Sequence, residues 1–373
     1  MSVKVRPFTI EVPPDEVDRM KRKLRDTRMP KLPIGRPSLT HKLYNKFVNF
    51  DWQVAHNHIQ RHQHFIATIP DENTTVDIHF THTRSSNPDA IPLLLIHGWP
   101  GSFFEFDRVV DDLAKTFHVV VPNIPGFMWS SPPPRRGWTL SDTARLYNKL
   151  MHALGHTAYA AQAGDWGMFI ARELGSKYTS SCKAVHLNFC PTPLPDNLES
   201  SDLAEREKRV EARCDDWLDN HLGYAVCMRS RPHTIGVAFA DNPVAIMMWV
   251  GEKYLELAHP NHMDEKWWDD VLTTVCLYYF SGCIMTSMLP YFENAKHADF
   301  GTHVLSPANR ITCPMGFTSY MYDSRPGTKR GVERSGNLVW YREVDEGGHF
   351  AALETPEGFV EDLRAFLGEH YHT

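Results

Sequence analysis

A carboxylate in a segment of small residues is the first candidate for chemistry. Asp165 lies within Ala163-Gly164-Asp165-Trp166-Gly167, where small neighbours permit a sharp turn between a strand and a helix. An aspartate is ionised at pH 7, so it needs no base to act as a nucleophile. Attack on the carbon of an epoxide or an alkyl halide gives an ester that water can cleave, whereas a serine would give a stable ether. The alternative is that Asp165 only caps a helix.

A histidine late in the chain is the candidate base for cleaving such an ester. The chain has 21 histidines, and we select His349 because it lies on a glycine-rich loop, Glu346 to Phe350, after the last predicted strand. A carboxylate that follows the preceding strand should orient its ring. Asp323 is the best placed, since Asp345 and Glu346 lie within or beside the histidine's own loop.

Two backbone amides could stabilise the negative charge that develops during ester cleavage. The turn His97-Gly98-Trp99-Pro100-Gly101 follows a short apolar run and could direct the Trp99 N–H toward the same point as the Trp166 N–H. Such a pair of donors forms an oxyanion hole. The alternative is an ordinary turn at the end of a strand.

These residues require strands and helices that bring distant segments to one edge of a sheet. Short apolar runs predict strands at 91–96, 118–122, 158–161, 184–189, 314–320 and 338–341. Apolar residues at helical spacing predict helices at 14–25, 140–154 (capped by Ser141), 168–174 and 355–367. Residues 191–308 are expected to be mostly helical. The pattern predicts one α/β domain with a parallel sheet and an inserted helical lid.

Composition excludes several classes of protein. The chain has 373 residues, of which 42% are hydrophobic and 23% charged, as in folded rather than disordered proteins. A net charge of −6 argues against binding to nucleic acid or to an anionic membrane. The 7 cysteines include no Cys-x-x-Cys pair, and no apolar run reaches the roughly 18 residues that cross a bilayer. We therefore expect a soluble cytoplasmic protein, and the oligomeric state, including a homodimer, stays open.

Several motifs together resemble the microsomal type of epoxide hydrolase, in particular its soluble fungal members. The resemblance extends over nearly the whole chain. It rests on the segments Arg6 to Phe8, Phe50 to Trp52, His97 to Ser102, Gly164 to Gly167, Arg231 to Gly236, Trp249 with Glu252 to Tyr254, and Glu346 to Phe350. It implies an α/β-hydrolase fold with an N-terminal segment at 1–85, a core at 86–190 and 309–373, and a helical lid at 191–308.

The resemblance also implies roles for individual residues. The family's nucleophile falls on Asp165, its water-activating base on His349 and the acid that supports this base on Asp323, where some members carry Glu. Two lid tyrosines that hold and protonate the epoxide oxygen fall on Tyr224 and Tyr291. A phenol with a pKa of about 10 can donate a proton to an alkoxide and still be protonated at neutral pH.

The activity implied by the resemblance is hydrolysis of a small apolar epoxide by water, without a metal or another cofactor. A cis peptide bond between Trp99 and Pro100 is also implied. The nearest alternative is a haloalkane or haloacid dehalogenase of the same fold, which shares the Asp nucleophile and could bind halide with the Trp166 indole. A leaving halide, however, needs no tyrosine acid. The other alternative is a hydrolase-fold protein that only binds a small apolar ligand.

Overall fold

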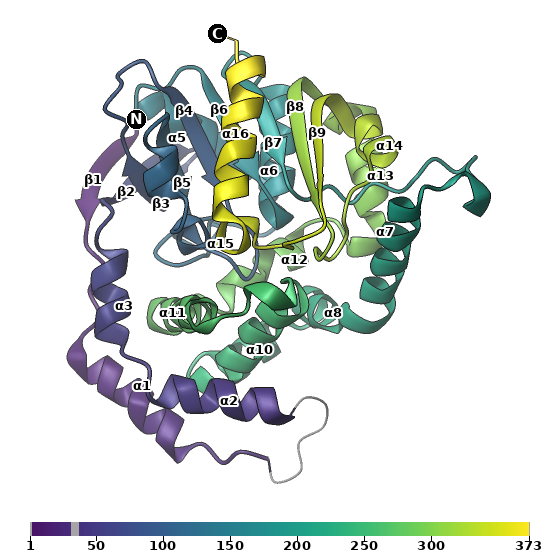
Figure 1. Cartoon of the computed structure of the whole chain (residues 1–373). Coiled ribbons are helices and arrows are strands. Elements are labelled where there is room, and N and C mark those ends of the chain that lie inside the picture. The colour runs from purple at the N-terminus through teal and green to yellow at the C-terminus, as the bar shows by residue number, and fades with distance from the viewer. Residues whose placement is uncertain (1, 31–36, 373) are drawn as a thin grey trace.

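One mixed sheet of nine strands organises the molecule (Figure 1). In this computed structural model, which describes residues 2–30 and 37–372, the strand order is β1-β2-β3-β5-β4-β6-β7-β8-β9. Strands β4 to β9 pair in parallel, whereas β1, β2 and β3 pair antiparallel and join the sheet at β5. The strands are β1 Lys4–Phe8, β2 His64–Asp71, β3 Thr74–Thr83, β4 Ile91–Ile96, β5 Phe117–Pro122, β6 Tyr159–Ala163, β7 Cys182–Leu187, β8 Ile311–Tyr320 and β9 Gly336–Val344.

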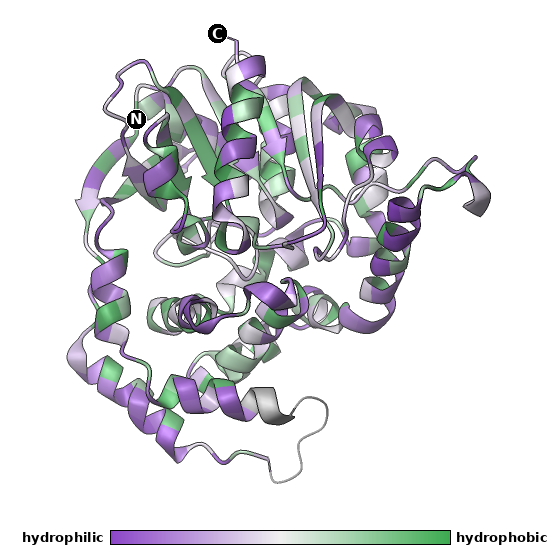
Figure 2. Cartoon of the chain, viewed as in Figure 1, coloured by the Kyte–Doolittle hydropathy of each residue, from purple (hydrophilic) through white to green (hydrophobic). Residues whose placement is uncertain are grey.

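The parallel strands confirm the six strands predicted from apolar runs, with small shifts at their ends. Every residue of β5 and β6 is buried, because helices cover both faces of this part of the sheet. Figure 2 shows hydrophobic residues in the central strands of the sheet, while the outer helices carry both hydrophobic and hydrophilic residues. Burial on both faces therefore explains why these strands read as continuous apolar runs.

The antiparallel strands β2 and β3 escaped prediction because polar residues occupy some of their buried positions, and β1 escaped it because its residues are mostly exposed. His64 Nδ1 lies 3.1 Å from His79 Nε2, and the Asn123 side-chain nitrogen lies 2.6 Å from His79 Nδ1. Burial lowers the pKa of His64 to about 4, so its ring is neutral at pH 7. Neutral histidines that are hydrogen-bonded to each other can thus occupy buried positions of a strand. A sequence pattern alone would assign such positions to an exposed polar segment.

Helices on both sides of the sheet lie close to those predicted. In Figure 1, α16 (Pro356–His370) passes in front of the sheet and α6 (Asp165–Lys177) behind it. The helices predicted at 14–25, 140–154 and 355–367 are confirmed as α1 (Pro14–Asp26), α5 (Leu140–Ala153) and α16. Shorter helices of the core are α4 Val110–Leu113, α14 Lys329–Val332 and α15 Ala351–Glu354.

Two details of these helices differ from expectation. The helix predicted at 168–174 already begins at Asp165. The cap of α5 is Thr139 and not Ser141, because the Asp142 carboxylate accepts the Thr139 backbone N–H at 2.9 Å. A carboxylate three residues after the cap can reach back to this N–H, and that reciprocal arrangement sets the first turn of the helix.

Residues 191–308, all of them described, form helices and no strand, as predicted. They comprise α7 Glu205–Asp216, a π-helical turn Trp217–His221, α8 Gly223–Ser230, α9 Pro232–Phe239, α10 Pro243–Glu256, α11 Glu265–Ser281, α12 Leu289–Glu293 and α13 Phe300–Leu305. Among the described residues, no single helix is long and apolar enough to cross a bilayer. One pair of helices, α11 and the segment Thr286–Glu293, reaches the required length and apolar composition only when both are counted together, and the two are bent by 110° relative to each other.

The N-terminal helices lie along the lid. Helices α1 and α2 (Pro37–Val48) contact α10, and α3 (Trp52–Ile59) contacts α11. Trp52 and Phe280 pack with ring centroids 4.8 Å apart, and Arg19 donates to the Tyr279 hydroxyl at 3.0 Å. Because β2 and β3 belong to the main sheet, the sheet continues across residue 85. The division into a segment at 1–85, a core and a lid at 191–308 stays a prediction.

Candidate active site

Asp165 stands at the junction of β6 and α6, as the strand-turn-helix pattern predicts. Its φ of 44° lies in the left-handed region, which is unfavourable for a side chain other than glycine. A Cβ at Gly167 would collide with the carbonyl oxygen of Ile96, and a Cβ at Gly98 would collide with the Asp165 carboxylate. Glycine at these two positions therefore permits the close approach that presents the carboxylate at the edge of the sheet.

The turn after β4 brings a backbone donor to this carboxylate. The Trp99 N–H donates to Asp165 Oδ1 at 2.7 Å, and the Trp166 amide also donates to the carboxylate. The peptide bond between Trp99 and Pro100 is cis, as the resemblance implies. Both amides predicted as oxyanion donors thus reach the Asp165 carboxylate, Trp99 at Oδ1, while the other oxygen, Oδ2, lies toward His349.

His349 and Asp323 come together behind Asp165. Asp323 Oδ1 lies 2.7 Å from His349 Nδ1, and His349 Nε2 lies 3.6 Å from Asp165 Oδ2. The backbone N–H of Ser324 donates to the same Asp323 oxygen at 2.5 Å. The loop of His349 is held by its own N–H, which donates to the carbonyl of Leu257 in the lid at 2.9 Å. The three residues selected from separate parts of the sequence therefore form one row, in which His349 is hydrogen-bonded to Asp323 and makes an ion-pair contact with Asp165.

Charges around His349 determine its protonation. Burial disfavours the imidazolium, but the carboxylates of Asp323, Asp165 and Glu105 outweigh burial and raise the pKa of His349 to about 9. Burial also raises the pKa of Asp165, against the opposing effects of His349 and the two backbone amides. The imidazole of the free protein is therefore largely protonated at pH 7 and stabilises the nucleophile as an anion.

Tyr224 and Tyr291 face each other across the site. Their ring centroids are 5.9 Å apart, Tyr224 stacks on Trp99 at 5.4 Å, and Tyr291 meets Trp166 edge-on at 4.8 Å. Burial, followed by the charge of Asp165, raises the pKa of Tyr224 above its ordinary value. Burial likewise raises the pKa of Tyr291, whose buried hydroxyl lies close to the side chains of Tyr224 and Trp166. Both phenols are therefore protonated at neutral pH.

Helix α8, which carries Tyr224, begins just after the π-helical turn. Lys253 lies 4.6 Å from the centroid of the Tyr224 ring and 5.7 Å from that of Trp217, so a cation faces both rings. Lys253 itself is only 3% exposed and pairs with Glu256 at 2.5 Å. The family resemblance, and not any local physical pattern, selects Tyr224 from the 13 tyrosines of the chain.

Three titratable residues near the site escaped prediction. Burial raises the pKa of Glu105 to about 8, with His349 opposing it and Asp165 adding to it, and the Glu105 carboxylate packs over Gly101. Glu354 accepts the N–H groups of Phe350 and His259, so it joins the histidine loop to the lid. The third residue is Arg325, which lines the cavity at Asp165. No local motif distinguishes any of them from a surface residue, because their contacts come from distant segments.

A small cavity opens at Asp165. Its volume is about 10 Å³, which holds at most one water molecule, so a substrate enters only when lid side chains move. Its walls are mainly aromatic and are made by Asp165, Trp166, Phe169, Phe189, Trp217, Tyr224, His297, Phe300, Ser324 and Arg325. An apolar substrate with a reactive polar group suits this lining.

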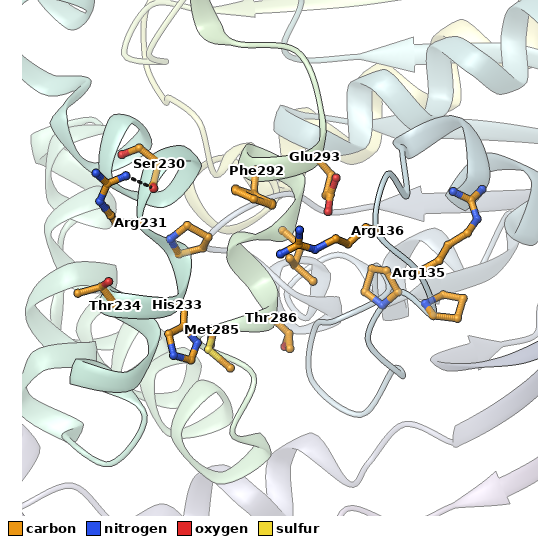
Figure 3. Close-up of a pocket in the computed structure, with 14 residues that line it drawn as sticks. Arg135, Arg136, Ser230, Arg231, His233, Thr234, Met285, Thr286, Phe292 and Glu293 are labelled. Carbon is orange, nitrogen blue, oxygen red and sulfur yellow. Dashed lines mark hydrogen bonds between the residues drawn. The ribbon is translucent and has the colours of Figure 1, made fainter.

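A larger cavity of about 610 Å³ lies on the outer side of the lid. Figure 3 shows Arg231 and His233 on one wall and Arg136 on the other, with Phe292 between them. Neither Asp165 nor His349 lines this cavity, so it is separate from the carboxylate and the histidine. Within the described part of the chain, no group of three His, Cys, Asp or Glu side chains is placed to hold a metal ion.

Comparisons with known proteins agree with this geometry. The family described as epoxide hydrolase N terminus matches residues 5–106, and the alpha/beta hydrolase fold family matches residues 91–218. The solved structure of Aspergillus niger epoxide hydrolase has 31% sequence identity with this chain and a TM-score of 0.89. The match covers 99% of this chain and 97% of the Aspergillus niger chain. The chain belongs to the epoxide hydrolase family.

More distant members share the same architecture. Epoxide hydrolase 1 of Sus scrofa is 27% identical, and the match covers 98% of this chain and 88% of that protein. The juvenile hormone epoxide hydrolase of Bombyx mori is 23% identical, covers 99% of this chain and 95% of its own, and has a TM-score of 0.87, which shows a common fold. The resemblance and the α/β-hydrolase fold predicted from the sequence are thereby confirmed.

Proposed function

We propose that this member of the epoxide hydrolase family converts an epoxide and water into a vicinal diol through an ester on Asp165. The observation that carries the proposal is the approach of one buried carboxylate to the Trp99 amide at 2.7 Å and to the His349 imidazole at 3.6 Å, beside two protonated tyrosines. This set supplies a nucleophile, a base, an oxyanion donor and an acid for one reaction.

Ring opening is the first step. Asp165 Oδ2 attacks an epoxide carbon, a carbon–oxygen bond of the ring breaks, and the released alkoxide takes a proton from Tyr224 or Tyr291. An alkoxide is a poor leaving group without such a donor, and general-acid help of this kind is worth a factor of about 10²–10⁴ in rate. The raised pKa of both phenols keeps the proton available at pH 7.

Ester cleavage is the second step. His349 takes a proton from water, and the hydroxide attacks the carbonyl carbon of the Asp165 ester while the Trp99 and Trp166 amides hold the oxyanion. Ester formation has already removed the charge of Asp165, one of the charges that raise the pKa of His349. The ester therefore favours transfer of the imidazolium proton to the tyrosinate that ring opening leaves, and this transfer restores the tyrosine and gives the neutral imidazole that a base requires. When the diol leaves, Asp165 is again a carboxylate and His349, with the proton from water, is again an imidazolium.

A dehalogenase is the second candidate, and one observation favours it. The indole N–H groups of Trp99 and Trp166 are buried and have no acceptor among the described residues, so they could hold a halide. Against this, a departing halide takes no proton, so a dehalogenase would have no use for Tyr224 and Tyr291 as acids. The family assignment also favours the epoxide.

The test is product analysis with two kinds of electrophile. Purified protein is incubated with styrene oxide and with a haloalkane of similar size, and diol and halide are measured. We expect diol from the epoxide, little halide, and no product of either kind from Asp165→Asn, whose thermal unfolding should match that of the original protein. Halide release without diol would establish the dehalogenase, and diol formation by Asp165→Asn would refute the nucleophile.

We also propose that the enzyme works in the cytoplasm. All seven cysteines are free, and five of them are buried. Free thiols in this number suit a reducing compartment. Fractionation of cells that express a tagged chain should place it in the soluble cytosolic fraction, and recovery with membranes would contradict the proposal.

A further inference from the structure

One arginine in the wall of the Asp165 cavity lacks a counter-ion. Arg325 follows Asp323 by two residues and lines the same cavity as Asp165 and Tyr224. Its Nη1 donates to the carbonyl of His297 at 3.4 Å, and the side chain also forms a hydrogen bond with the Cys214 thiol. Its Nε is buried and has no acceptor among the described residues, and no described carboxylate lies within 4.0 Å of its guanidinium.

Neighbouring arginines of the same region are satisfied. Arg330 pairs with Glu207, Arg342 pairs with Asp362, and Arg213 donates to three backbone carbonyls. Arg325 is therefore unusual in its surroundings, because its half-buried guanidinium has no carboxylate partner and its buried Nε loses the hydrogen bond that it would make in water.

The protein groups nearest Arg325 do not neutralise it. The side chain lies beside the Cys214 thiol, whose pKa burial raises to about 11, so this thiol carries no charge at pH 7. The positive charge of Arg325 acts to lower the pKa of Glu211, yet burial still keeps the pKa of Glu211 above its ordinary value. A well-formed ion pair with Arg325 would lower that pKa instead. The guanidinium is thus left able to bind a further anion.

A guanidinium at this place suits a carboxylate of the substrate. Its planar fork binds a carboxylate through two parallel hydrogen bonds, and it is more weakly hydrated than an ammonium group. The rest of the wall, including Phe189, Trp217 and Phe300, is aromatic and suits an apolar body. Asp165 would repel an anion, so the carboxylate must lie at the Arg325 end while the epoxide ring reaches Asp165.

We propose that Arg325 selects epoxides that carry a carboxylate at the far end of an apolar body. This inference rests on the proposed function, because it concerns the substrate of the same site. Arg325 contacts substrate in this scheme, but it takes no part in either bond-making step. Its contribution is therefore specificity: it favours the acid over a neutral molecule of the same shape.

The test compares matched pairs of substrates. Terminal epoxides with a straight alkyl chain that ends in a carboxylate are compared with the corresponding primary amides, over a range of chain lengths. The quantity measured is the ratio of kcat/KM for the acid to kcat/KM for the amide. A charge-assisted pair should favour the acid about 10- to 100-fold at the best chain length. In Arg325→Met this preference should disappear, and in Arg325→Lys it should fall in part, because Lys keeps the charge and loses the fork.

Arg136→Met is the matched control. Arg136 is exposed on the outer cavity of Figure 3 and has no ion pair within the described part of the chain, so this change removes the same charge outside the site. It should leave the ratio as it is in the original protein. Because a ratio is measured on one protein sample, partial loss of folded protein in any variant does not alter it.

Three outcomes would overturn the inference. One is a ratio at or below one for the original protein at every chain length. Another is an equal ratio in the original protein and Arg325→Met. In both cases diol from the amides would still support the proposed function, so only the specificity would fail. Absence of diol from every acid and every amide would overturn the proposed function and this inference together.

Discussion

Replacing Asp165 with asparagine should lower the pKa of His349. The asparagine keeps nearly the same shape and removes the charge, so it imitates the neutral ester. A carboxylate favours the imidazolium, and its loss therefore favours the neutral ring and shifts the titration downward from the pKa of about 9 of the original protein. The direction holds whichever other charges remain, because Asp323 and Glu105 are unchanged.

The separation of the two groups sets the size of this change. His349 Nε2 and Asp165 Oδ2 are 3.6 Å apart. Two unit charges at that distance interact by about 1 kcal/mol with the dielectric constant of water and by about 5 kcal/mol with an effective value of about 20. Since a change of one in pKa corresponds to about 1.4 kcal/mol, the midpoint should fall by about 1 to 3 pH units.

The assay is an NMR titration of protein labelled at its histidine rings. His349→Gln identifies the signal of His349 by its disappearance, and the exposed change Asp15→Asn serves as the control for loss of a distant negative charge. The control should move the midpoint by much less than Asp165→Asn does. An unchanged or higher midpoint in Asp165→Asn would refute the argument that ester formation releases His349 to act as a base.

Two further predictions address the separate steps. His349→Gln should still form the Asp165 ester but fail to cleave it, so intact mass should rise by the mass of the epoxide; normal turnover with unmodified mass would mean that another group activates water. Tyr224→Phe and Tyr291→Phe should each slow ester formation in single-turnover kinetics, the double change by about 10²–10⁴, while cleavage of a preformed ester changes little. Tyr254→Phe is the control, because the Tyr254 ring packs on Phe350 with centroids 3.8 Å apart. If Tyr254→Phe slowed ester formation as much as Tyr224→Phe does, the assignment of Tyr224 and Tyr291 as the acids would be wrong.

The sequence by itself determined the features that local physics controls. Parallel strands buried on both faces need continuous apolar residues, so β4 and β5 can be read directly from the chain. A nucleophile on a tight turn needs small neighbours, which marks Asp165, and a histidine on a glycine-rich loop after the last strand marks His349. The two tyrosines could be chosen only through the resemblance, because a lid tyrosine usually serves packing.

Only the tertiary structure decided what depends on segments that are distant in sequence. Strands β2 and β3 bury His64 and His79 by pairing them with each other and with Asn123, and no periodicity in the sequence reveals that contact. Arg325 and Glu105 look like ordinary surface charges until the fold brings them close to Asp165. The charge and the solvent exposure of such a group are set by its neighbours in space, and those neighbours come from parts of the chain that no local pattern connects.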